Sequence, residues 1–305
     1  MHPKSLQLTT VFYEKLVMTK RIDLHTHSTA SDGVLSPAEV VRLAHQEGVG
    51  TIALTDHDTV DGLEEARQEA ERLGMRFVPG VELSVTWGKK TIHIVSLAPK
   101  ELGPYRCYAK RIWQQRDASA RKMGAKFEAL GIYNMYESAL ELAGNPLNLS
   151  RRHFAMALHQ RGTVGSEDEA FARYLRDDGP AFVKTEWSSL SDAMRLIEET
   201  GGIAVLAHPG RYRFPEPYSI QDLLEDFRAL GGEVIEVTTG SHCPSENESF
   251  IRVAVNMGFA ASTGSDYHGH RPGRPGLGQQ EQLPTYLTTV LDLIDKRNNQ
   301  GWILF

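Results

Sequence analysis

The sequence contains few cysteines and no long apolar run. Its two cysteines, Cys107 and Cys243, lie far apart and form no C-x-x-C pair. A disulfide framework is therefore not expected, and a reducing cytoplasm is the expected compartment. No stretch approaches the roughly 18 consecutive apolar residues of a membrane helix, so we expect neither a membrane span nor a membrane partner.

An excess of one sign of charge is also missing. The 305 residues include 33 Lys and Arg against 39 Asp and Glu, which gives a net charge of −6. This balance argues against a protein that binds nucleic acid over its whole surface, so metal ions and a few cationic side chains must attract any anionic substrate locally. With 41% hydrophobic and 24% charged residues, the chain can form a sizeable globular core.

The N-terminal residues lack the basic start, the long apolar core and the small-residue cleavage site of a signal peptide. We predict that residues 1–20 are an extension of the folded domain. Met18 is the expected natural start of the protein.

From residue 21 onward, the chain alternates between predicted strands and helices. Ser36 can cap the first helix, because Pro37 follows it and Glu39 stands three residues beyond the cap. Strands are predicted at residues 22–26, 51–54, 76–83 and 90–97. This rhythm predicts an α/β fold with a largely parallel sheet or barrel, whose active site lies where the C-terminal ends of the strands meet the loops.

Residues 104–182 differ from this pattern, since they contain several predicted helices and no convincing strand. Strand and helix alternate again from residue 183, and the chain closes with a predicted helix near residues 286–298. We therefore predict a barrel formed by residues 21–103 and 183–305, with residues 104–182 inserted as an α-helical cap over its mouth.

Nine side chains suited to metal coordination lie within or just past the predicted strands. None is decisive alone, since Asp32 lies in an Asp-Gly turn that needs no metal and His93 could be an ordinary core histidine. Glu82 is more telling, because a charge in an apolar strand is costly unless it is paired or metal-bound. Together, nine nitrogen and oxygen ligands are too many for one ion and fit a cluster. They are His25, His27, Asp32, His57, Glu82, His93, His208, Asp266 and His268.

The ordered motifs DLHTHSTASDG, ALTDHDTVDG, GVELS, HI, LAHPGRY and GSDYHG resemble those of the polymerase and histidinol phosphatase (PHP) family. They cover residues 21–98 and about 202–278. The resemblance implies a distorted seven-stranded (β/α) barrel that holds two or three divalent ions at its mouth. It also implies a metal-dependent phosphoesterase.

The resemblance further implies how the ligands are shared among the ions. The first ion takes His25, His27, Glu82 and Asp266. The second shares Glu82 and adds His93 and His208. The third takes Asp32, His57 and His268, and its metal preference is open because many family members carry histidine at the position of Asp32.

The ligand set also bears on the expected metal and nucleophile. Nitrogen and oxygen ligands suit Mn²⁺, Zn²⁺ and Fe²⁺ alike, and the resemblance favours Mn²⁺. Two ions about 3.5–4 Å apart can bridge a hydroxide and hold a phosphate in line with it. The expected nucleophile is therefore a metal-bound hydroxide held by Glu82, Asp266 and His208.

Within the cap, SRRHFAMAL and AFV resemble the branch of the family that acts on nucleotides. This implies a phosphoric monoester hydrolase that removes the 3′-phosphate of nucleoside 3′,5′-bisphosphates, for example converting adenosine 3′,5′-bisphosphate to AMP. A 5′-to-3′ exoribonuclease on short 5′-phosphorylated RNA is the first alternative, and the basic stretch 105–126 would favour it. A histidinol or sugar phosphatase and a non-catalytic metal-binding module are the others, and no obligate protein partner is implied.

Substrate phosphates need donors beyond the metal ions. Arg211 follows His208 by three residues and should lie over the same strand end, while residues 151–153 begin a predicted helix whose backbone N–H groups favour anions. Any one of the candidates could instead be an ordinary surface residue. The candidates are Arg211, His153, Arg151, Arg152, Lys184 and His242.

Overall fold

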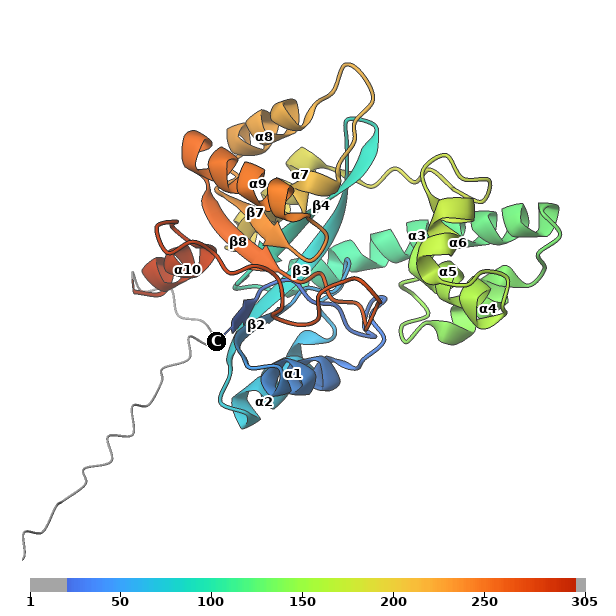
Figure 1. Ribbon diagram of the computed structural model, residues 1–305, viewed down its shortest axis with the longest axis horizontal. Helices are drawn as coiled ribbons and strands as arrows, with labels where there is room; N and C mark the ends of the chain where they lie inside the picture. Colours follow the sequence, from blue (N-terminus) through green and yellow to red (C-terminus); the bar gives the residue numbers. More distant parts are fainter. Residues whose placement is uncertain (1–20, 300–305) are drawn as a thin grey trace, which may run out of the picture.

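The computed structural model describes residues 21–299, and it confirms the predicted α/β barrel (Figure 1). The predicted extension at residues 1–20 lies outside these described residues. A barrel-shaped sheet is surrounded by helices, and a separate helical lobe projects from one side of it. Within residues 21–299, no helix is long and apolar enough to cross a membrane.

Seven strands follow one another around the barrel, and the first and last of them meet. In order they are β1 (Arg21–Asp23), β2 (Val49–Leu54), β3 (Arg76–Trp87), β4 (Lys90–Leu97), β6 (Ile203–Leu206), β7 (Val234–Thr239) and β8 (Ala260–Gly264). The short β5 (Ser188–Ser189) pairs with β3 outside this path. The backbone N–H of Leu24 donates to Thr263 at 3.0 Å, and that of His27 donates to Tyr267 at 2.9 Å, so the sheet is nearly closed.

One strand runs against the others, which refines the prediction of a largely parallel sheet. β4 is antiparallel to both β3 and β6, whereas the remaining pairs are parallel. The reason is a tight hairpin, in which Gly88 and Lys89 adopt φ angles of 54° and 65°. Two successive left-handed residues are what a two-residue hairpin turn requires, and such a turn leaves no room for a parallel crossover.

The strand predicted at residues 22–26 ends earlier, at Asp23. The Asp23 carboxylate is buried and accepts hydrogen bonds from the backbone N–H groups of Ser265 and Gly278, both at 2.8 Å. This carboxylate therefore ties the end of β1 to the C-terminal part of the barrel. Beyond it, the chain keeps a single bridge from Thr26 to Tyr267 and passes into the loop that carries His25 and His27.

Helices cover the outside of the barrel, and their termini follow the sequence signals. Ser36 accepts a hydrogen bond from the backbone of Glu39 at 3.3 Å and donates its own N–H to the Glu39 side chain at 2.8 Å, which confirms the predicted capping box. The outer helices are α1 (Pro37–Gln46), α2 (Leu63–Arg72), α7 (Leu190–Glu199), α8 (Ile220–Ala229), α9 (Pro244–Met257) and α10 (Val290–Asn299).

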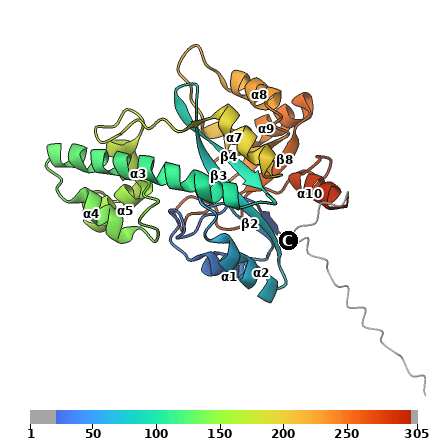
Figure 2. The same cartoon turned by 180° about the vertical axis from the view of Figure 1, so that it is seen from behind.

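The helical lobe has an apolar core of its own, distinct from that of the barrel. In this core the rings of Phe127 and Phe154 stack at 5.9 Å between centroids. Figure 2 shows α3 running from the barrel into the lobe beside α4 and α5. The lobe comprises α3 (Gly103–Ala129), α4 (Met135–Leu142), α5 (Arg151–Gln160), α6 (Glu167–Ala170) and the π-helical turn η1 (Phe171–Leu175). The exact domain boundaries at residues 104 and 182 stay a prediction.

A buried arginine anchors the lobe to the barrel. Arg116 of α3 pairs with Asp58, and its guanidinium also lies 5.1 Å from the centre of the Trp187 ring. Asp58 in turn accepts hydrogen bonds from the backbone and hydroxyl of Ser84, at 2.7 and 2.8 Å. Because a buried charge is costly without partners, this network fixes the direction in which α3 leaves the barrel.

Candidate metal centre

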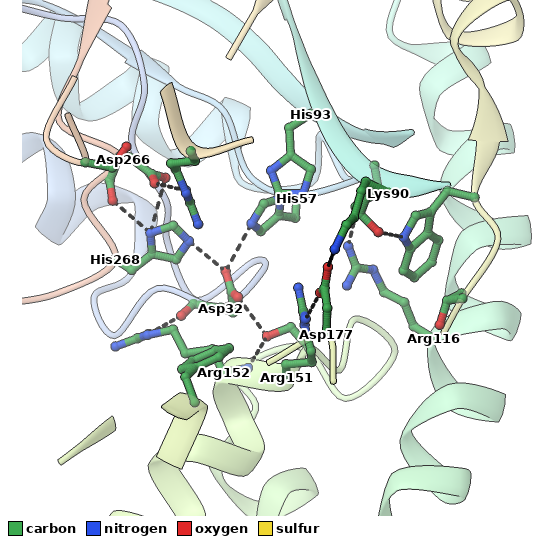
Figure 3. Close-up of a pocket in the computed structure, with 18 of the residues that line it drawn as sticks. Asp32, His57, Lys90, His93, Arg116, Arg151, Arg152, Asp177, Asp266 and His268 are labelled. Carbon is green, nitrogen blue, oxygen red and sulfur yellow. Dashed lines mark hydrogen bonds and ion pairs between the residues drawn. The ribbon is translucent and has the colours of Figure 1, made fainter. Parts of the chain in front are cut away.

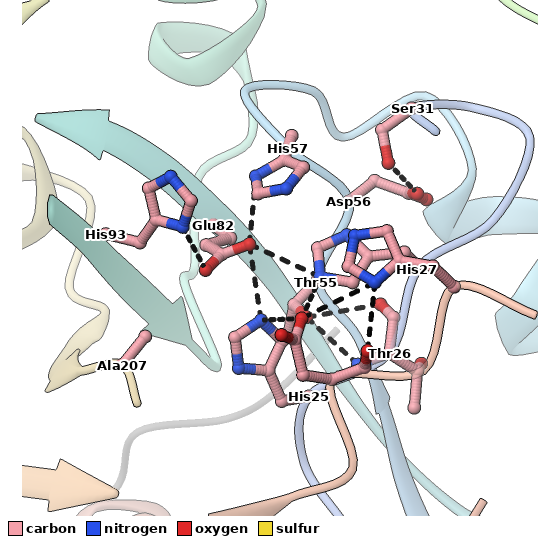
Figure 4. Close-up of polar contacts among 12 residues, drawn as sticks. His25, Thr26, His27, Ser31, Thr55, Asp56, His57, Glu82, His93 and Ala207 are labelled. Carbon is pink, nitrogen blue, oxygen red and sulfur yellow. Dashed lines mark hydrogen bonds and ion pairs between the residues drawn. The ribbon is translucent and has the colours of Figure 1, made fainter. Parts of the chain in front are cut away.

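The nine predicted ligands meet at one end of the barrel, around the fully buried Glu82 of β3. One carboxylate oxygen, Oε2, faces three imidazoles. It lies 3.2 Å from Nε2 of His25, 3.3 Å from Nε2 of His27 and 2.9 Å from Nδ1 of His57. Figure 4 shows Glu82 among these rings, which come from the chain segments after β1 and β2.

The second oxygen of Glu82 faces two more imidazoles from the opposite side. Its Oε1 lies 2.8 Å from Nδ1 of His93 on β4 and 3.0 Å from Nε2 of His208, which follows β6. One carboxylate thus contacts five histidines. It is placed as a bridging ligand would be, which agrees with the role that the sequence resemblance implied for it.

The atoms form three overlapping groups, each with its ligand atoms within 4.8 Å of one another. The first comprises His25, Glu82, His208 and Asp266; the second His57, Glu82 and His93; the third His27, Asp32, His57 and His268. This partition differs from the one implied by the sequence resemblance. His208 joins the group of Asp266, His27 joins that of Asp32, and His57 belongs to two groups. His27 nevertheless stays close to the first group, since its Nε2 lies 3.3 Å from both Glu82 Oε2 and Asp266 Oδ1.

The arrangement fits divalent metal ions because its polar atoms are buried without other partners. Among residues 21–299, Nε2 of His25, Nε2 of His27 and Oε2 of Glu82 have no partner in hydrogen-bond geometry. The same is true of Oδ1 of Asp32 and Nδ1 of His57. Each such buried group costs about 1–3 kcal/mol if it stays unsatisfied. A set of converging nitrogen and oxygen atoms of this kind is satisfied by metal coordination.

Electrostatics keeps the carboxylates of the cluster ionised. Burial alone would raise the pKa of Glu82, but the surrounding histidines, His57 and His93 foremost, lower it well below its usual value. Burial opposes a charge on His27 as well, yet the nearby carboxylates of Asp266 and Glu82 raise its pKa to about 9. Burial and the nearby Arg211 lower the pKa of His208 to about 3, so its ring is neutral. Ionised carboxylates and neutral imidazoles are the forms that bind metals.

A second carboxylate, Glu236 of β7, supports the cluster from behind. Its Oε1 lies 2.7 Å from Nδ1 of His25, and its Oε2 accepts the backbone N–H of His208 at 2.6 Å. His208 has a left-handed backbone, with φ 31° and ψ 57°, which is unfavourable for a residue with a side chain. Glu236 was not among the predicted site residues, although, like Glu82, it is a charge within an apolar strand, which is a signal for such a role.

The loop that carries Asp32 is held by Asp56. The Asp56 carboxylate accepts hydrogen bonds from the backbone and hydroxyl of Ser28, at 2.7 and 2.6 Å, and from the hydroxyl of Ser31 at 2.6 Å. From the lobe, the hydroxyl of Ser150 donates to Asp32 Oδ2 at 2.7 Å. The position of Asp32 therefore depends on contacts from both the barrel and the lobe.

The cluster forms the floor of a cleft of about 370 Å³ between the barrel mouth and the lobe. Asp32, His57, His93, Asp266 and His268 face this cleft (Figure 3). Its walls carry many cations, and acidic side chains are few among its lining residues. The cations are Lys89, Lys90, Arg116, Arg151, Arg152, Lys184, Arg211, Arg271 and Arg274.

Three of the predicted substrate-binding residues, Arg211, Arg151 and Lys184, line the cleft. Arg211 lines it beside the cluster, where its Nη1 lies 2.8 Å from Oδ2 of Asp266. Arg151 and Lys184 line the opposite wall, formed by the lobe and the segment that returns from it. Lys90, at the hairpin between β3 and β4, also lines the cleft and was missed by sequence reasoning. The sequence feature that could have identified it is the Lys89-Lys90 pair next to a tight turn.

The structure uses the other three predicted residues for internal contacts. Arg152 lines the cleft, but its guanidinium binds Glu167 at 3.0 Å and the backbone oxygen of Asp32. His153 is buried, and its Nδ1 accepts the backbone N–H of Ser150 at 3.0 Å. His242 accepts the backbone N–H of Gly210 through Nε2 at 2.9 Å. These side chains shape the loops around the cleft.

Comparisons with known proteins agree with this architecture. The sequence model of the PHP domain matches residues 23–240. The chain is 42% identical over 264 residues to a 3′,5′-nucleoside bisphosphate phosphatase of Chromobacterium violaceum, covering 86% of this chain and 92% of that protein. It is 39% identical over 252 residues to a 5′-3′ exoribonuclease of Haemophilus influenzae, covering 82% of this chain and 91% of that protein.

A solved structure also resembles the fold. It is an amidohydrolase from Chromobacterium violaceum with bound sulfate and no metal, and its sequence is 40% identical to this chain. The two structures superpose with a TM-score of 0.85 over 91% of this chain and 96% of the other. The likeness therefore includes both the barrel and the helical lobe.

Proposed function

The chain belongs to the PHP domain family, and we propose that it removes the 3′-phosphate from nucleoside 3′,5′-bisphosphates. One observation carries this proposal: a cluster suited to metal ions forms the floor of a cleft whose walls are lined by cations. Such a site offers separate places for two phosphates, one at the floor and one at the wall. The Chromobacterium violaceum relative, named a 3′,5′-nucleoside bisphosphate phosphatase, supports this substrate class.

Two or three divalent ions, with Mn²⁺ favoured, would be held by the three groups, of which the first two share Glu82 and the last two share His57. When bound, such ions polarise phosphoryl oxygens and make a nucleophile from water near neutral pH. The chain itself supplies the ionised carboxylates and the imidazoles that hold them, and His25 and His27 give up a ring proton to do so. It also supplies the lobe, which covers the cluster and limits the access of bulk water.

Arg211 is proposed to bind the phosphate that is hydrolysed. Its guanidinium already contacts Asp266, one of the residues of the cluster, so it lies at the edge of the floor. Guanidinium groups bind phosphate oxygens through two parallel hydrogen bonds, and these contacts can follow the charge as it develops on the reacting group.

Arg151, Lys90 and Lys184 are proposed to bind the second phosphate. They come from the lobe, from the β3–β4 hairpin and from the segment before β5, and all three line the cleft. Arg152, His153 and His242 contribute indirectly, since their contacts fix neighbouring loops. Phe182 and Trp187 lie along the same wall and offer ring faces to a base.

A 5′-to-3′ exoribonuclease is the second candidate function. The relative from Haemophilus influenzae carries that name, and the cationic wall of the cleft also suits the backbone of a short RNA. Both activities break a 3′ P–O bond while the protein holds a 5′-phosphate. A non-catalytic role is disfavoured, because all nine ligand side chains are in place and the relatives carry the names of enzymes.

Turnover of adenosine 3′,5′-bisphosphate compared with that of 5′-phosphorylated di- and trinucleotides separates the two functions. We expect the bisphosphate to yield AMP and phosphate at the higher kcat/KM. If the oligonucleotides are cut and the bisphosphate is inert, the exoribonuclease assignment replaces the first.

Cys107 and Cys243 are free and exposed within the described range, which suits the proposed cytoplasmic location.

A further inference from the structure

One carboxylate lies between two cations on the wall of the cleft. Oδ2 of Asp177 is 2.6 Å from Nζ of Lys90, and its Oδ1 is 3.3 Å from Nη1 of Arg151. Lys90 belongs to the barrel, whereas Arg151 begins α5 in the lobe, so Asp177 links the two parts. Figure 3 shows the three side chains beside His57 and His93 of the cluster.

The Arg151 side chain is held in place by contacts that do not involve Asp177, and the backbone of Lys90 is fixed by the hairpin. Arg151 also donates to the backbone oxygen of Leu175 at 3.2 Å, and its guanidinium lies 5.5 Å from the centre of the Phe182 ring. Lys90 follows the tight hairpin turn and begins β4. Removal of the carboxylate would therefore leave two positive charges facing one position.

The carboxylate itself is an exchangeable partner. Its side chain is 46% exposed, and the three side chains together line the cleft that a substrate must enter. A phosphate monoester carries up to two negative charges and three acceptor oxygens, against one charge and two oxygens for a carboxylate. The two cations are therefore better matched by a phosphate than by the single carboxylate of Asp177.

We propose that Asp177 is a specificity-determining residue: an internal anion in the second-phosphate subsite, which the 5′-phosphate of the substrate displaces. The inference rests on the proposed function, since it concerns the phosphate that is not hydrolysed. A ligand without this phosphate leaves Asp177 in place and gains nothing from Lys90 and Arg151. The group recognised is a terminal 5′-phosphate monoester, from either a mononucleotide or the end of an RNA.

A plain structural clamp is the competing explanation. If Asp177 serves to join barrel and lobe, its replacement should loosen the cleft and weaken ligand binding. If Asp177 occupies the subsite, its replacement should strengthen the binding of a 5′-phosphate. The two explanations predict opposite signs.

The test is calorimetric titration of the full-length protein with AMP, which has the 5′-phosphate and no 3′-phosphate. We expect Asp177→Asn to bind AMP about threefold to tenfold more tightly, because a half-exposed ion pair no longer competes. Asp178→Asn is the matched control. Asp178 pairs with Arg176 at 2.9 Å and is outside the described residues that line the cleft, so its replacement should leave AMP affinity unchanged.

A second pair of variants ties the effect to the subsite. Lys90→Met should weaken AMP binding. When Asp177→Asn is added to Lys90→Met, the increase in AMP affinity should be smaller than the increase that Asp177→Asn gives in the otherwise wild-type protein. Adenosine, which has no phosphate, should bind all variants equally. The KM of Asp177→Asn for adenosine 3′,5′-bisphosphate and for a 5′-phosphorylated dinucleotide shows which source of the phosphate uses the subsite.

Equal or weaker AMP binding by Asp177→Asn, with unchanged thermal stability, would overturn the inference. An undiminished AMP affinity in Lys90→Met would overturn it too, because the subsite would then lie elsewhere. A fall in thermal stability together with weaker binding would favour the clamp. These results concern AMP binding alone, so they are distinguishable from a failure of the proposed function, in which adenosine 3′,5′-bisphosphate is not hydrolysed.

Discussion

Nδ1 of His25 lies 2.7 Å from Oε1 of Glu236, and both side chains are buried inside the barrel. When the His25 ring is neutral, as a metal ligand must be, this contact holds its proton on Nδ1 and leaves Nε2 to face Glu82 and Asp266. A carboxylate behind a histidine is a common way to orient a metal ligand. Glu236 also binds the backbone of His208, so one side chain positions two members of the cluster.

Replacement of Glu236 by Gln should therefore weaken metal binding. We expect a loss of about 10–100-fold in affinity, as is usual when the partner of a ligating histidine is changed. Competition with a chelator measures this affinity directly. Glu233→Gln is the control, since Glu233 begins the same segment but is 58% exposed and pairs with Arg297 on the surface. Equal affinity in Glu236→Gln and Glu233→Gln would contradict the positioning role.

Replacement of Glu82 by Gln should remove metal and activity together. Five histidines face this one carboxylate, and an amide cannot supply the negative charge or a second oxygen acceptor. Turnover should fall by about a thousandfold or more. Elemental analysis of the purified variant, alongside its kcat, checks the prediction. Full metal content in Glu82→Gln would show that the ions bind elsewhere.

The metal-free protein should lose stability as the pH rises from about 6.5 to about 9. The folded pKa of His27 is about 9, above the usual value of 6.5, because the opposing effect of burial is outweighed by the nearby carboxylates of Asp266 and Glu82. A raised pKa means that the protonated ring stabilises the folded state, and this contribution disappears as the pH rises through the folded pKa. The pKa of His25 is also raised, so it acts in the same direction.

Thermal unfolding of chelator-treated protein across this pH range measures the effect. His27→Gln should show a shallower fall in Tm than the wild type, since the contribution of His25 remains. The lowered pKa values of His93 and His268 affect stability below pH 6.5, outside this window. Metal affinity should increase over the same range, because the ions must displace the ring protons. Identical profiles for wild type and His27→Gln would contradict the assignment.

Replacement of Arg211 by Met should raise KM for adenosine 3′,5′-bisphosphate by about tenfold or more, because a charged hydrogen bond to phosphate contributes about 1.5–3 kcal/mol. Metal content should stay unchanged. Arg213→Met serves as the control, since Arg213 is 76% exposed and is absent from the described residues that line the cleft. An unchanged KM in Arg211→Met would assign the reacting phosphate to other donors.

The sequence predicted those metal-ligand candidates that lie at the C-terminal ends of strands. Residues such as His25, Glu82 and Asp266 are far apart in the chain, but parallel strands bring their C-terminal ends to one edge. The capping box at Ser36 and the strand at residues 90–97 follow from local signals and appear in the structure as predicted. The alternation of strands and helices was enough to predict the barrel.

What the sequence could not provide depends on contacts between distant side chains. The position of each ligand ring is set by partners such as Glu236, which no local pattern reveals. Arg152 and His153 follow an N-cap, and that position alone does not show that Glu167 and Ser150 already occupy them. The same holds for Lys90, whose place in the cleft depends on how the hairpin meets the lobe.

The ratio of kcat/KM for adenosine 3′,5′-bisphosphate to that for adenosine 3′-monophosphate tests the central claim most directly, since the two differ in the 5′-phosphate alone. The cluster around Glu82 is proposed to act on one phosphate while Lys90 and Arg151 hold the other. We therefore predict a ratio of about 100 or more, because two charge-assisted contacts at about 1.5 kcal/mol each are lost with the 5′-phosphate. A ratio near one would contradict the account and identify a phosphatase that does not recognise the 5′-phosphate.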